Sequence, residues 1–364
     1  MKRVLTSVLA LGLLASPAAA QGDLLSACGS MTVTFTPFTP SSAERDNAEQ
    51  QLRFLCGQVV AALTNVQPTI GIGFTGGNPV LGTATTIGRR LGLFPRISVT
   101  ARGNLALADV PDLLNGFDAT IGSSGQLPPM ETNMVPFGAL QGDVALGLFN
   151  GMSAGPLGGF GAIDLLGSIS MIPAVEQTGM ADPIINWGAG ARIGILKQGL
   201  VLPGISVSGM YRNMAEVSFG DLDAGDPAEF STDLSILSLR AGISKGILAL
   251  DFAAGAGYDM YSSDVGFDFV LTCPPNECLP AVEARVEPTE RIEGELKTAA
   301  WNVFGNVGLS LLVVNVVGEL GYQKATEVVT AADFRDAGLP DQQPTAGDLS
   351  GGRLFGSVGV RFTF

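Results

Sequence analysis

The 364-residue chain contains no histidine, and this absence narrows the chemistry open to it. Histidine is the commonest general base and metal ligand because its imidazole titrates near neutral pH. A serine–lysine or carboxylate-only catalytic site is chemically feasible, but no spacing in the sequence supports one. We therefore expect a protein that is not an enzyme and that has no cofactor and no metal site.

The chain also lacks a long hydrophobic run. After residue 20, no stretch approaches the roughly 18 consecutive apolar residues that a spanning helix needs. Yet the mean hydropathy is +0.35 and 46% of the residues are hydrophobic, values typical of a membrane protein. In hydrocarbon every backbone N–H and C=O must be paired within the protein, so the alternative to helices is a closed β-barrel. The 49 glycines and the charged fraction of only 15% favour that alternative.

Basic residues are scarce. The sequence has 20 Lys and Arg against 34 Asp and Glu, a formal net charge of -14. Such acidity argues against nucleic acid as a partner, because phosphate binding needs a Lys/Arg surface. Two of the basic residues, Lys2 and Arg3, precede an apolar run from Val4 to Ala15 and then Ala18-Ala19-Ala20. This order predicts a secretory signal peptide over residues 1–20.

The rest of the chain is dominated by segments in which apolar and polar residues alternate, the period of a strand with one apolar face. About ten such segments are typical of an all-β, antiparallel up-and-down transmembrane β-barrel. They are Phe94–Ala108, Val135–Phe149, Phe160–Ile172, Ile185–Leu196, Val201–Ala215, Phe230–Ser244, Ile247–Tyr261, Leu296–Leu312, Val314–Ala325 and Gly352–Phe364.

The connections between these segments alternate in length. With a periplasmic start, the odd connections are expected to be long and extracellular and the even ones to be short and periplasmic. The long connections are 109–134, 173–184, 216–229, 262–295 and 326–351, and the short ones are 197–200, 245–246 and the neighbourhood of Val313. Residues 150–159 are intermediate in length.

Tryptophan and tyrosine give a second, independent indication. Their apolar rings with polar tips favour the membrane–water interface. In the expected topology, all of them lie at the extracellular ends of their strands and form an interface girdle: Trp187, Tyr211, Tyr258, Tyr261, Trp301 and Tyr322. A soluble sandwich would place such residues in its core without this sorting.

Charged residues of both signs occupy inward positions of the predicted strands. The candidate lumen-lining residues are Arg96, Arg102, Asp143, Asp164, Arg192, Arg212, Arg240, Asp251, Asp259, Glu319 and Arg361. In a narrow barrel, ionised interior groups must either pair or face water. Two interpretations follow: a salt-bridge network that fills the interior, or a charged pathway for a small solute.

The segment before the barrel, residues 21–92, has a different pattern. Ser41 and Glu44 form a capping box, and Leu52, Leu55, Val59 and Leu63 recur at helical spacing, which predicts a periplasmic or lumenal helix from Ser42 to Leu63. The glycine-rich residues that follow form either a hairpin of Thr69–Thr75 and Thr83–Leu91 or a plug within the barrel. We favour the hairpin, because two more strands raise ten to twelve and keep the number even. Residues 93–364 then form the rest of the barrel.

The four cysteines of an exported chain indicate disulfide bonds, with three possible connectivities. Cys273 and Cys278 enclose the short segment PPNE in the longest expected extracellular loop, so we predict a local bridge there. By elimination, Cys28 pairs with Cys56. A metal site is the rival interpretation, but it would lack the histidines that usually share such a role.

The last residues, VGVRFTF, combine with the leader and the alternating segments into a resemblance to bacterial outer-membrane β-barrel proteins. In that class the final strand commonly ends in Phe, which the barrel-assembly machinery reads as a signal. The resemblance therefore implies such a role for Val360, Phe362 and Phe364, with outer-membrane lipid and lipopolysaccharide as surroundings. Among transport barrels the chain is similar to the FadL type, whose plug motif Asn-Pro-Ala is echoed by Asn78-Pro79-Val80. That family uses more strands than ten.

The expected function is passive passage or facilitated uptake of a small or amphiphilic solute across the outer membrane. The competing hypothesis is a closed structural or adhesive barrel that acts through its extracellular loops. Nothing in the sequence separates the two, because both need the same wall.

Overall fold

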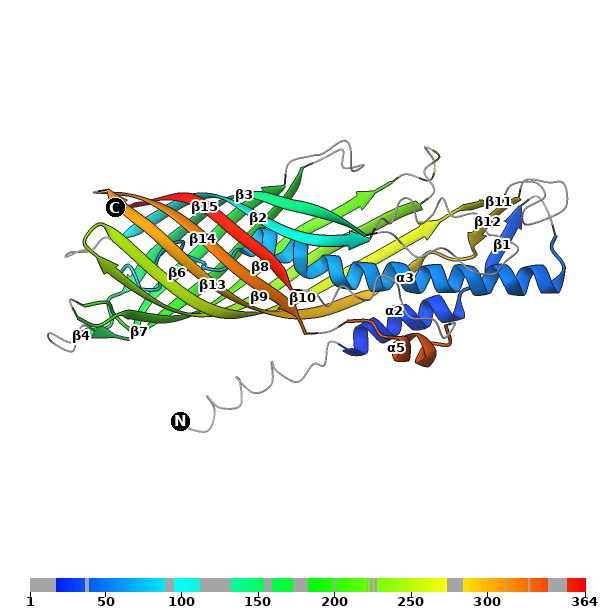
Figure 1. The fold of residues 1–364 in the computed structure, drawn as a ribbon, viewed down its shortest axis with the longest axis horizontal. Helices are drawn as coiled ribbons and strands as arrows, with labels where there is room; N and C mark the ends of the chain where they lie inside the picture. The colour runs from blue at the N-terminus through cyan, green and yellow to red at the C-terminus, as the bar shows by residue number, and fades with distance from the viewer. Residues whose placement is uncertain are drawn as a thin grey trace.

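The computed structural model (Figure 1) describes a barrel with helices at one end. It describes residues 18–36, 39–88, 95–111, 132–153, 159–172, 183–199, 201–220, 222, 225, 228–273, 284–311, 313–326, 328–339 and 352–364. Residues 1–17 of the expected signal peptide and Cys278 of the expected second disulfide lie outside these ranges. Within the described ranges, no helix is long and apolar enough to cross a lipid bilayer.

The wall is a closed antiparallel barrel of ten strands, each paired with its neighbour along the chain. The strands are β2 (Ile97–Pro111), β3 (Thr132–Phe149), β6 (Ala162–Ile172), β7 (Ile184–Leu196), β8 (Gly204–Phe219), β9 (Ala228–Ile247), β10 (Leu250–Phe269), β13 (Ile292–Leu311), β14 (Val314–Ala325) and β15 (Arg353–Thr363). Pairing of β15 with β2 closes the ring. The predicted all-β up-and-down barrel is confirmed, with ten strands.

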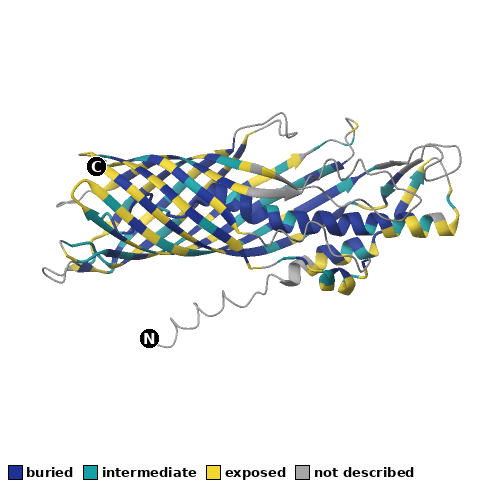
Figure 2. Cartoon of the chain, viewed as in Figure 1, coloured by how far each residue is buried: buried dark blue, intermediate teal, exposed yellow. Residues whose placement is uncertain are grey.

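Exposed and buried residues alternate along the strands of the wall (Figure 2). Many of the exposed residues are apolar and are together called the belt, whereas many of the buried ones are polar or charged. On β7, Ile185, Trp187, Ile193 and Ile195 are exposed while Arg192 is buried. The belt covers Ile185–Ile195 on β7, a length that matches the roughly 9 to 11 residues a tilted strand needs to cross hydrocarbon. The wall is therefore built to stand in lipid.

Three strands continue well beyond this belt, and there the alternation is inverted. On β9, β10 and β13 the inward side chains become apolar, as at Phe230, Phe267 and Leu296, whereas outward residues such as Asp264 and Glu293 are polar. The loop predicted over residues 262–295 is therefore too long, because residues 262–269 belong to β10 and residues 292–295 to β13. The strands extend because water, not lipid, meets their outer face, while their inner face packs on helices.

The helical end of the molecule, which we call the cap, has a hydrophobic core of its own. It comprises α2 (Ala18–Ser30), the first part of α3 (Ser42–Thr75), α5 (Ala331–Asp336) and a three-stranded sheet of β1 (Val33–Thr36), β12 (Ala284–Pro288) and β11 (Leu271–Cys273). Leu24, Leu52 and Phe334 are fully buried against Phe267 of the barrel extension. The cap lies opposite the end where the C-terminus and the short turns are found, which we call the turn end (Figure 1).

A disulfide bond joins Cys28 of α2 to Cys56 of α3, as predicted. The two cysteines are 28 positions apart, and both are fully buried in the cap core. A crosslink over a loop of this size stabilises a fold by about 2 to 4 kcal/mol, mainly by restricting the unfolded chain. The bridge therefore fixes α2 on α3 within the hydrophobic core of the cap.

Helix α3 begins at Ser42, as predicted, but it runs to Thr75 instead of Leu63, through Pro68. Its second half enters the lumen and contacts β2, β3, β9, β10, β13, β14 and β15. The predicted hairpin of Thr69–Thr75 and Thr83–Leu91 is therefore wrong, and the alternative, a plug within the barrel, is correct. Glycines and β-branched residues disfavour an isolated helix, but the surrounding wall supplies the packing and overrides that propensity.

Gly71 of α3 lies where the helix meets the ring of Tyr261. A Cβ at Gly71 would stand 2.1 Å from Tyr261 Cε1, so the helix can lie this close to β10 only without a side chain. We predict that Gly71→Ala destabilises the barrel by about 1 to 3 kcal/mol through overpacking, despite the better helix propensity of alanine. Urea unfolding of the protein in detergent measures this. Gly318→Ala, whose Cβ meets nothing within 4 Å, is the control and should remain near wild type; equal losses in both variants would contradict the close-packing explanation.

Candidate functional site: the occupied lumen

The lumen beyond α3 is occupied by residues 76–88, which we call the plug segment. Gly76 ends the helix with a φ of +58°, a left-handed conformation that glycine adopts without strain, and its N–H donates to Ile72 O at 2.9 Å. From there the chain continues to the turn end, where Gln198 N donates to Thr85 Oγ1 at 3.3 Å. The polypeptide thus passes through the barrel from the cap to the turn end.

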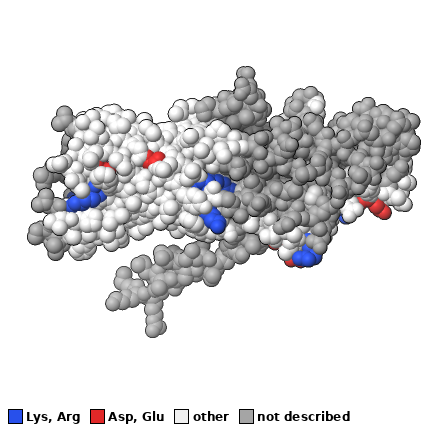
Figure 3. Space-filling model, viewed as in Figure 1, with Lys and Arg blue, Asp and Glu red and all other residues white. Residues whose placement is uncertain are grey.

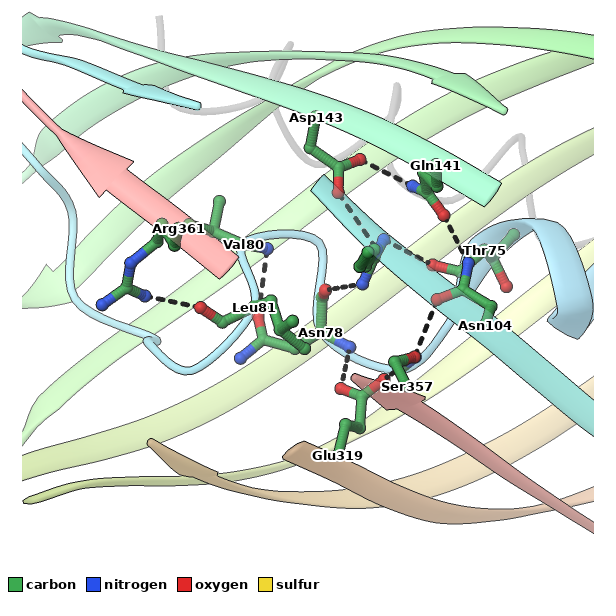
Figure 4. Close-up of polar contacts among 12 residues, drawn as sticks. Thr75, Asn78, Val80, Leu81, Asn104, Gln141, Asp143, Glu319, Ser357 and Arg361 are labelled. Atoms are coloured by element: carbon green, nitrogen blue, oxygen red, sulfur yellow. Dashed lines mark hydrogen bonds and ion pairs between the residues drawn. The ribbon is translucent and has the colours of Figure 1, made fainter. Parts of the chain in front are cut away.

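Glu319 of β14 holds the beginning of the plug segment. Its carboxylate accepts hydrogen bonds from the backbone N–H groups of Gly77 at 2.9 Å and Asn78 at 2.8 Å. Asn306 Nδ2 donates to the same carboxylate at 2.7 Å. Ser357 Oγ donates to it at 3.1 Å, as Figure 4 shows. Asn78 Nδ2 in turn donates to Asn306 Oδ1 at 2.6 Å. One buried carboxylate therefore accepts hydrogen bonds from four donors, two of them from the plug.

Arg102 of β2 clamps the same turn from the opposite side. Its guanidinium donates to Asn78 O at 2.9 Å and to Thr75 O at 3.2 Å, while Nε lies 3.0 Å from Asp143 Oδ2. Gln141 Nε2 donates to the other oxygen of Asp143 at 2.6 Å (Figure 4). The arginine thereby satisfies plug carbonyls while its own charge is balanced by the wall.

Arg240 of β9 and Asp259 of β10 form a second clamp. Arg240 donates to both carboxylate oxygens of Asp259, at 2.7 and 3.0 Å, in a bidentate pair. It also donates to Gly77 O at 2.8 Å and to Gly76 O at 3.2 Å. Asn302 completes the shell of Asp259 with a 2.7 Å hydrogen bond.

A third pair fixes the end of the plug segment. Arg192 of β7 lies 2.7 Å from Asp164 of β6 and donates to Thr83 O at 3.2 Å. Asp164 accepts from the backbone N–H groups of Ile87 at 3.1 Å and Gly88 at 3.4 Å. The same use of charge is seen in all three clamps: the arginine holds plug carbonyls, and a wall carboxylate neutralises the arginine.

Most of the predicted lumen-lining residues do face inward. Those that are buried inside the wall are Arg102, Asp143, Asp164, Arg192, Arg212, Arg240, Asp259, Glu319 and Arg361. Asp251 lies at the turn end, half-buried, and accepts a 2.5 Å hydrogen bond from Ser310 Oγ. Arg96 is exposed and lies one residue before the start of β2 at Ile97, outside the closed part of the wall. Its predicted placement in the lumen is therefore wrong.

Tyr261 was predicted in the interface girdle, and this placement is wrong. It is 2% exposed, points into the lumen beside α3 and accepts a 2.8 Å hydrogen bond from Gln323 Nε2. Because side chains alternate along a strand, Tyr261 and Tyr258, three positions apart, must face opposite sides. The outward aromatic residues form two close pairs, Trp187 with Tyr211 and Trp301 with Tyr322, at centroid distances of 6.4 and 5.8 Å, with Tyr258 opposite Trp301 on the neighbouring strand.

The end of β15 lies at the turn end. The rings of Phe362 and Phe364 stack on the outer face with centroids 6.5 Å apart, and Val360 points to the same side. Phe364 N donates to Ile97 O at 2.9 Å, which joins the last strand to the first. The aromatic ending thus has a structural role in closing the ring, apart from any role in assembly.

Sequence reasoning missed the uncharged polar partners in the lumen. Asn78, Asn104, Asn306, Gln141 and Ser357 connect the charged groups to one another and to the plug. The inward position of Asn104, Asn306, Gln141 and Ser357 follows from the alternation along their strands, so the sequence carries this signal. Asn78 stood in the quoted Asn-Pro motif, and only its contacts show that it is central.

The outside of the molecule divides into an uncharged belt and an acidic region next to the cap. On the visible face of the barrel, few charged side chains interrupt the white surface (Figure 3). Beyond the belt, Glu216, Asp233, Asp264, Glu293 and Glu295 border an open depression of about 450 Å³ on β8, β9, β10 and β13. Within the described part of the chain, no group of three or more His, Cys, Asp and Glu is placed to hold a metal ion.

Two carboxyl groups of this extramembrane region have shifted pKa values of opposite sign. A hydrogen bond from Lys297 and another from Ser262 lower the pKa of Glu295. Burial raises the pKa of Asp268, in spite of the hydrogen bond from the backbone of Phe269. Glu295 therefore keeps its negative charge to lower pH than an ordinary glutamate does, and Asp268 takes up a proton at higher pH than an ordinary aspartate does.

Comparisons with solved structures return bacterial outer-membrane proteins. Neisserial surface protein A is 7% identical, with a TM-score of 0.28 over 74% of this chain and 97% of that chain. The translocator domain of the autotransporter NalP from Neisseria meningitidis is 10% identical, with a TM-score of 0.36 over 76% and 91%. The TodX monoaromatic hydrocarbon channel deltaS2 mutant is 7% identical, with a TM-score of 0.27 over 77% and 92%.

No protein-family profile and no curated protein matches the sequence. The structural similarities are too weak to transfer a function, so the class is defined by the geometry of the chain itself. A closed antiparallel wall, an apolar outer belt, aromatic residues at its edges and a polar interior are together the features of a transmembrane β-barrel of the outer-membrane type.

The Arg240–Asp259 pair provides a test of the clamps. We predict that Asp259→Ala costs about 3 to 5 kcal/mol, because it leaves a buried guanidinium without its counter-charge. The double variant Asp259→Ala/Arg240→Met should cost less than the single one, since no uncompensated charge remains. Heat denaturation in detergent, read by gel mobility, measures both. Asp264→Ala, on the exposed face of the same strand, is the control; a double variant weaker than Asp259→Ala would refute the charge argument.

Proposed function

We propose that this protein is a closed outer-membrane barrel that is anchored through its own lumen and presents the disulfide-bonded cap at the cell surface for binding to a partner. The observation that carries the proposal is the path of the chain: it leaves the cap as α3, fills the lumen and emerges at the turn end. This supports the competing hypothesis of the sequence analysis over solute passage.

The orientation follows from the lengths of the connections. In single-chain bacterial barrels, the short turns are periplasmic and the long connections are extracellular. β9 and β10 are joined by two residues at the turn end, whereas β10 and β13 are joined through β11 and β12 at the cap. These lengths support an orientation with the cap outside the cell and the turn end in the periplasm.

The contents of the lumen support a closed state. Three ion pairs and the Glu319 carboxylate bind the plug segment over its whole length. Next to the plug, a cavity of about 10 Å³ lies between the segment and the wall, which is room for roughly one water molecule. A solute could pass only if these contacts were broken.

Gated passage is the second candidate, and one observation favours it. On β6 and β7, Ser170 and Asn186 face each other in register, both buried, and neither Ser170 Oγ nor the Asn186 amide has a hydrogen-bond partner within the described residues. Buried polar groups without a protein partner are typically satisfied by ordered water, so a hydrated seam on this side of the lumen supports gating. Movement of the plug away from this side would leave few bonds to break there.

Electrical recordings in planar bilayers separate the two candidates. We predict that the signal-cleaved wild-type protein shows no open-channel steps, because the lumen is occupied. Glu319→Ala should produce brief openings, since it releases the backbone N–H groups of Gly77 and Asn78. Glu293→Ala, an exposed carboxylate beyond the lumen, is the matched control and should be silent. Sustained conductance of the wild-type protein would favour the solute pathway instead.

Labelling of whole cells tests the presentation of the cap. A single cysteine in place of Asp46, which is exposed on α3, should react with a membrane-impermeant maleimide on intact cells. A cysteine in place of Val201, which is exposed at the turn end, should react only after the outer membrane is permeabilised. The parent chain serves as the blank for the native cysteines. The reverse pattern of labelling would overturn the proposed orientation.

A further inference from the structure

Arg212 of β8 is the least-partnered charge in the lumen. Its side chain belongs to a residue that is 1% exposed. Within the described part of the chain, its guanidinium donates one long hydrogen bond, from Nη1 to Ser238 Oγ at 3.4 Å. Its Nε is buried and has no acceptor within the described residues. Burying a cation without a counter-charge is strongly unfavourable, so a group of this kind requires a partner.

The wall does not provide that partner. The other arginines Arg102, Arg192 and Arg240 each form an ion pair with a wall carboxylate. Asp143 is the carboxylate whose charge acts most strongly on Arg212, but it is already bound to Arg102 and Gln141. The two other buried arginines without a carboxylate partner among the described residues are compensated by oxygens of the inner chain: Arg353 by Asn65 O and Arg361 by Leu81 O. Arg212 has no such oxygen.

A small cavity lies directly beside Arg212. Its volume is about 10 Å³, and its lining is Thr75, Gly77, Pro79, Ser208, Met210, Arg212, Ser238 and Arg240. Thr75 Oγ1, at the end of α3, is also buried and has no partner within the described residues. A guanidinium, a second arginine and three hydroxyl groups therefore border one space of the size of a single atom or water molecule, and no carboxylate borders it.

We propose that this cavity binds one small monovalent anion of the size of chloride, between Arg212 of the wall and Thr75 of α3. The guanidinium of Arg212 and the hydroxyl groups of Thr75, Ser208 and Ser238 can donate hydrogen bonds to the ion, whose charge would neutralise that guanidinium. The N–H groups of Arg240 are already bound to Asp259 and to backbone oxygens, so Arg240 contributes only its positive charge. A space with room for about one water molecule suits a monatomic ion better than a tetrahedral oxyanion such as sulfate. Because one ligand comes from the wall and the other from the end of α3, the bound ion joins the plug to the barrel. This goes beyond the proposed function, as it holds for a closed or a gated barrel.

The test is the halide dependence of stability in the full, signal-cleaved protein in detergent. Replacing gluconate by chloride or bromide at constant ionic strength should raise the thermal midpoint by several degrees in a saturable manner, because a ligand that binds only the folded state stabilises it. Arg212→Met should abolish this response. Arg361→Met, which removes a buried arginine outside the cavity, should retain it.

Thr75→Val and Ser208→Ala remove a hydroxyl group without removing charge, and they keep the test valid if Arg212→Met fails to fold. Each should weaken the halide response at least several-fold in the concentration needed for half-saturation. Anomalous scattering from crystals grown in bromide should show a peak between Arg212 and Thr75. A water molecule at that position without a bromide peak, or an equal halide response in wild type and in the Arg212 and Thr75 variants, would overturn the proposal.

Discussion

The structure depends on one constraint, that a polar group shielded from water must find its partner inside the protein. In the wall this requirement closes ten strands into a ring. In the lumen it recurs with charge: each of Arg102, Arg192 and Arg240 binds carbonyl groups of the inner chain, and each is neutralised by a carboxylate on a neighbouring strand. The plug and the wall therefore satisfy one another, and removing either leaves buried polar groups unpaired.

The position of the cap also follows from the need to bury groups against suitable partners. Above the lipid belt the barrel strands present apolar residues inward, and these residues cover the apolar side of α2 and of the first part of α3. One helix thus connects two environments, an apolar core in the cap and a polar lumen below it. The disulfide bond between Cys28 and Cys56 adds a covalent constraint in the apolar core of the cap. The anchor of the cap is therefore the barrel interior itself, over the length of the second half of α3 and the plug segment.

Much of the wall could be predicted from the sequence, because strand alternation is a local property. The alternation of Trp187, Ile193 and Ile195 identifies the lipid-facing side of β7 from its own sequence alone. Arg192 and Asp164 lie at the alternate positions of their strands, which therefore face inward. Where the surroundings change, the same rule misleads. The sequence pattern predicts a loop at residues 262–269 and 292–295, although both segments are strand. Outside the lipid belt the polar residues of these strands face outward, so the pattern typical of a lipid-facing strand stops there.

The sequence by itself determined the transmembrane barrel, its buried inward charges apart from the misplaced Arg96, the outward set of aromatic residues other than Tyr261, and the Cys28–Cys56 pairing. Only the tertiary structure decided that Thr69–Thr75 is helix, that residues 76–88 fill the lumen, and which carboxylate meets which arginine. The physical reason is the range of the forces involved. Alternation is set by lipid and water acting on each strand separately, whereas a glycine-rich helix and a buried charge are stable only because distant strands surround them.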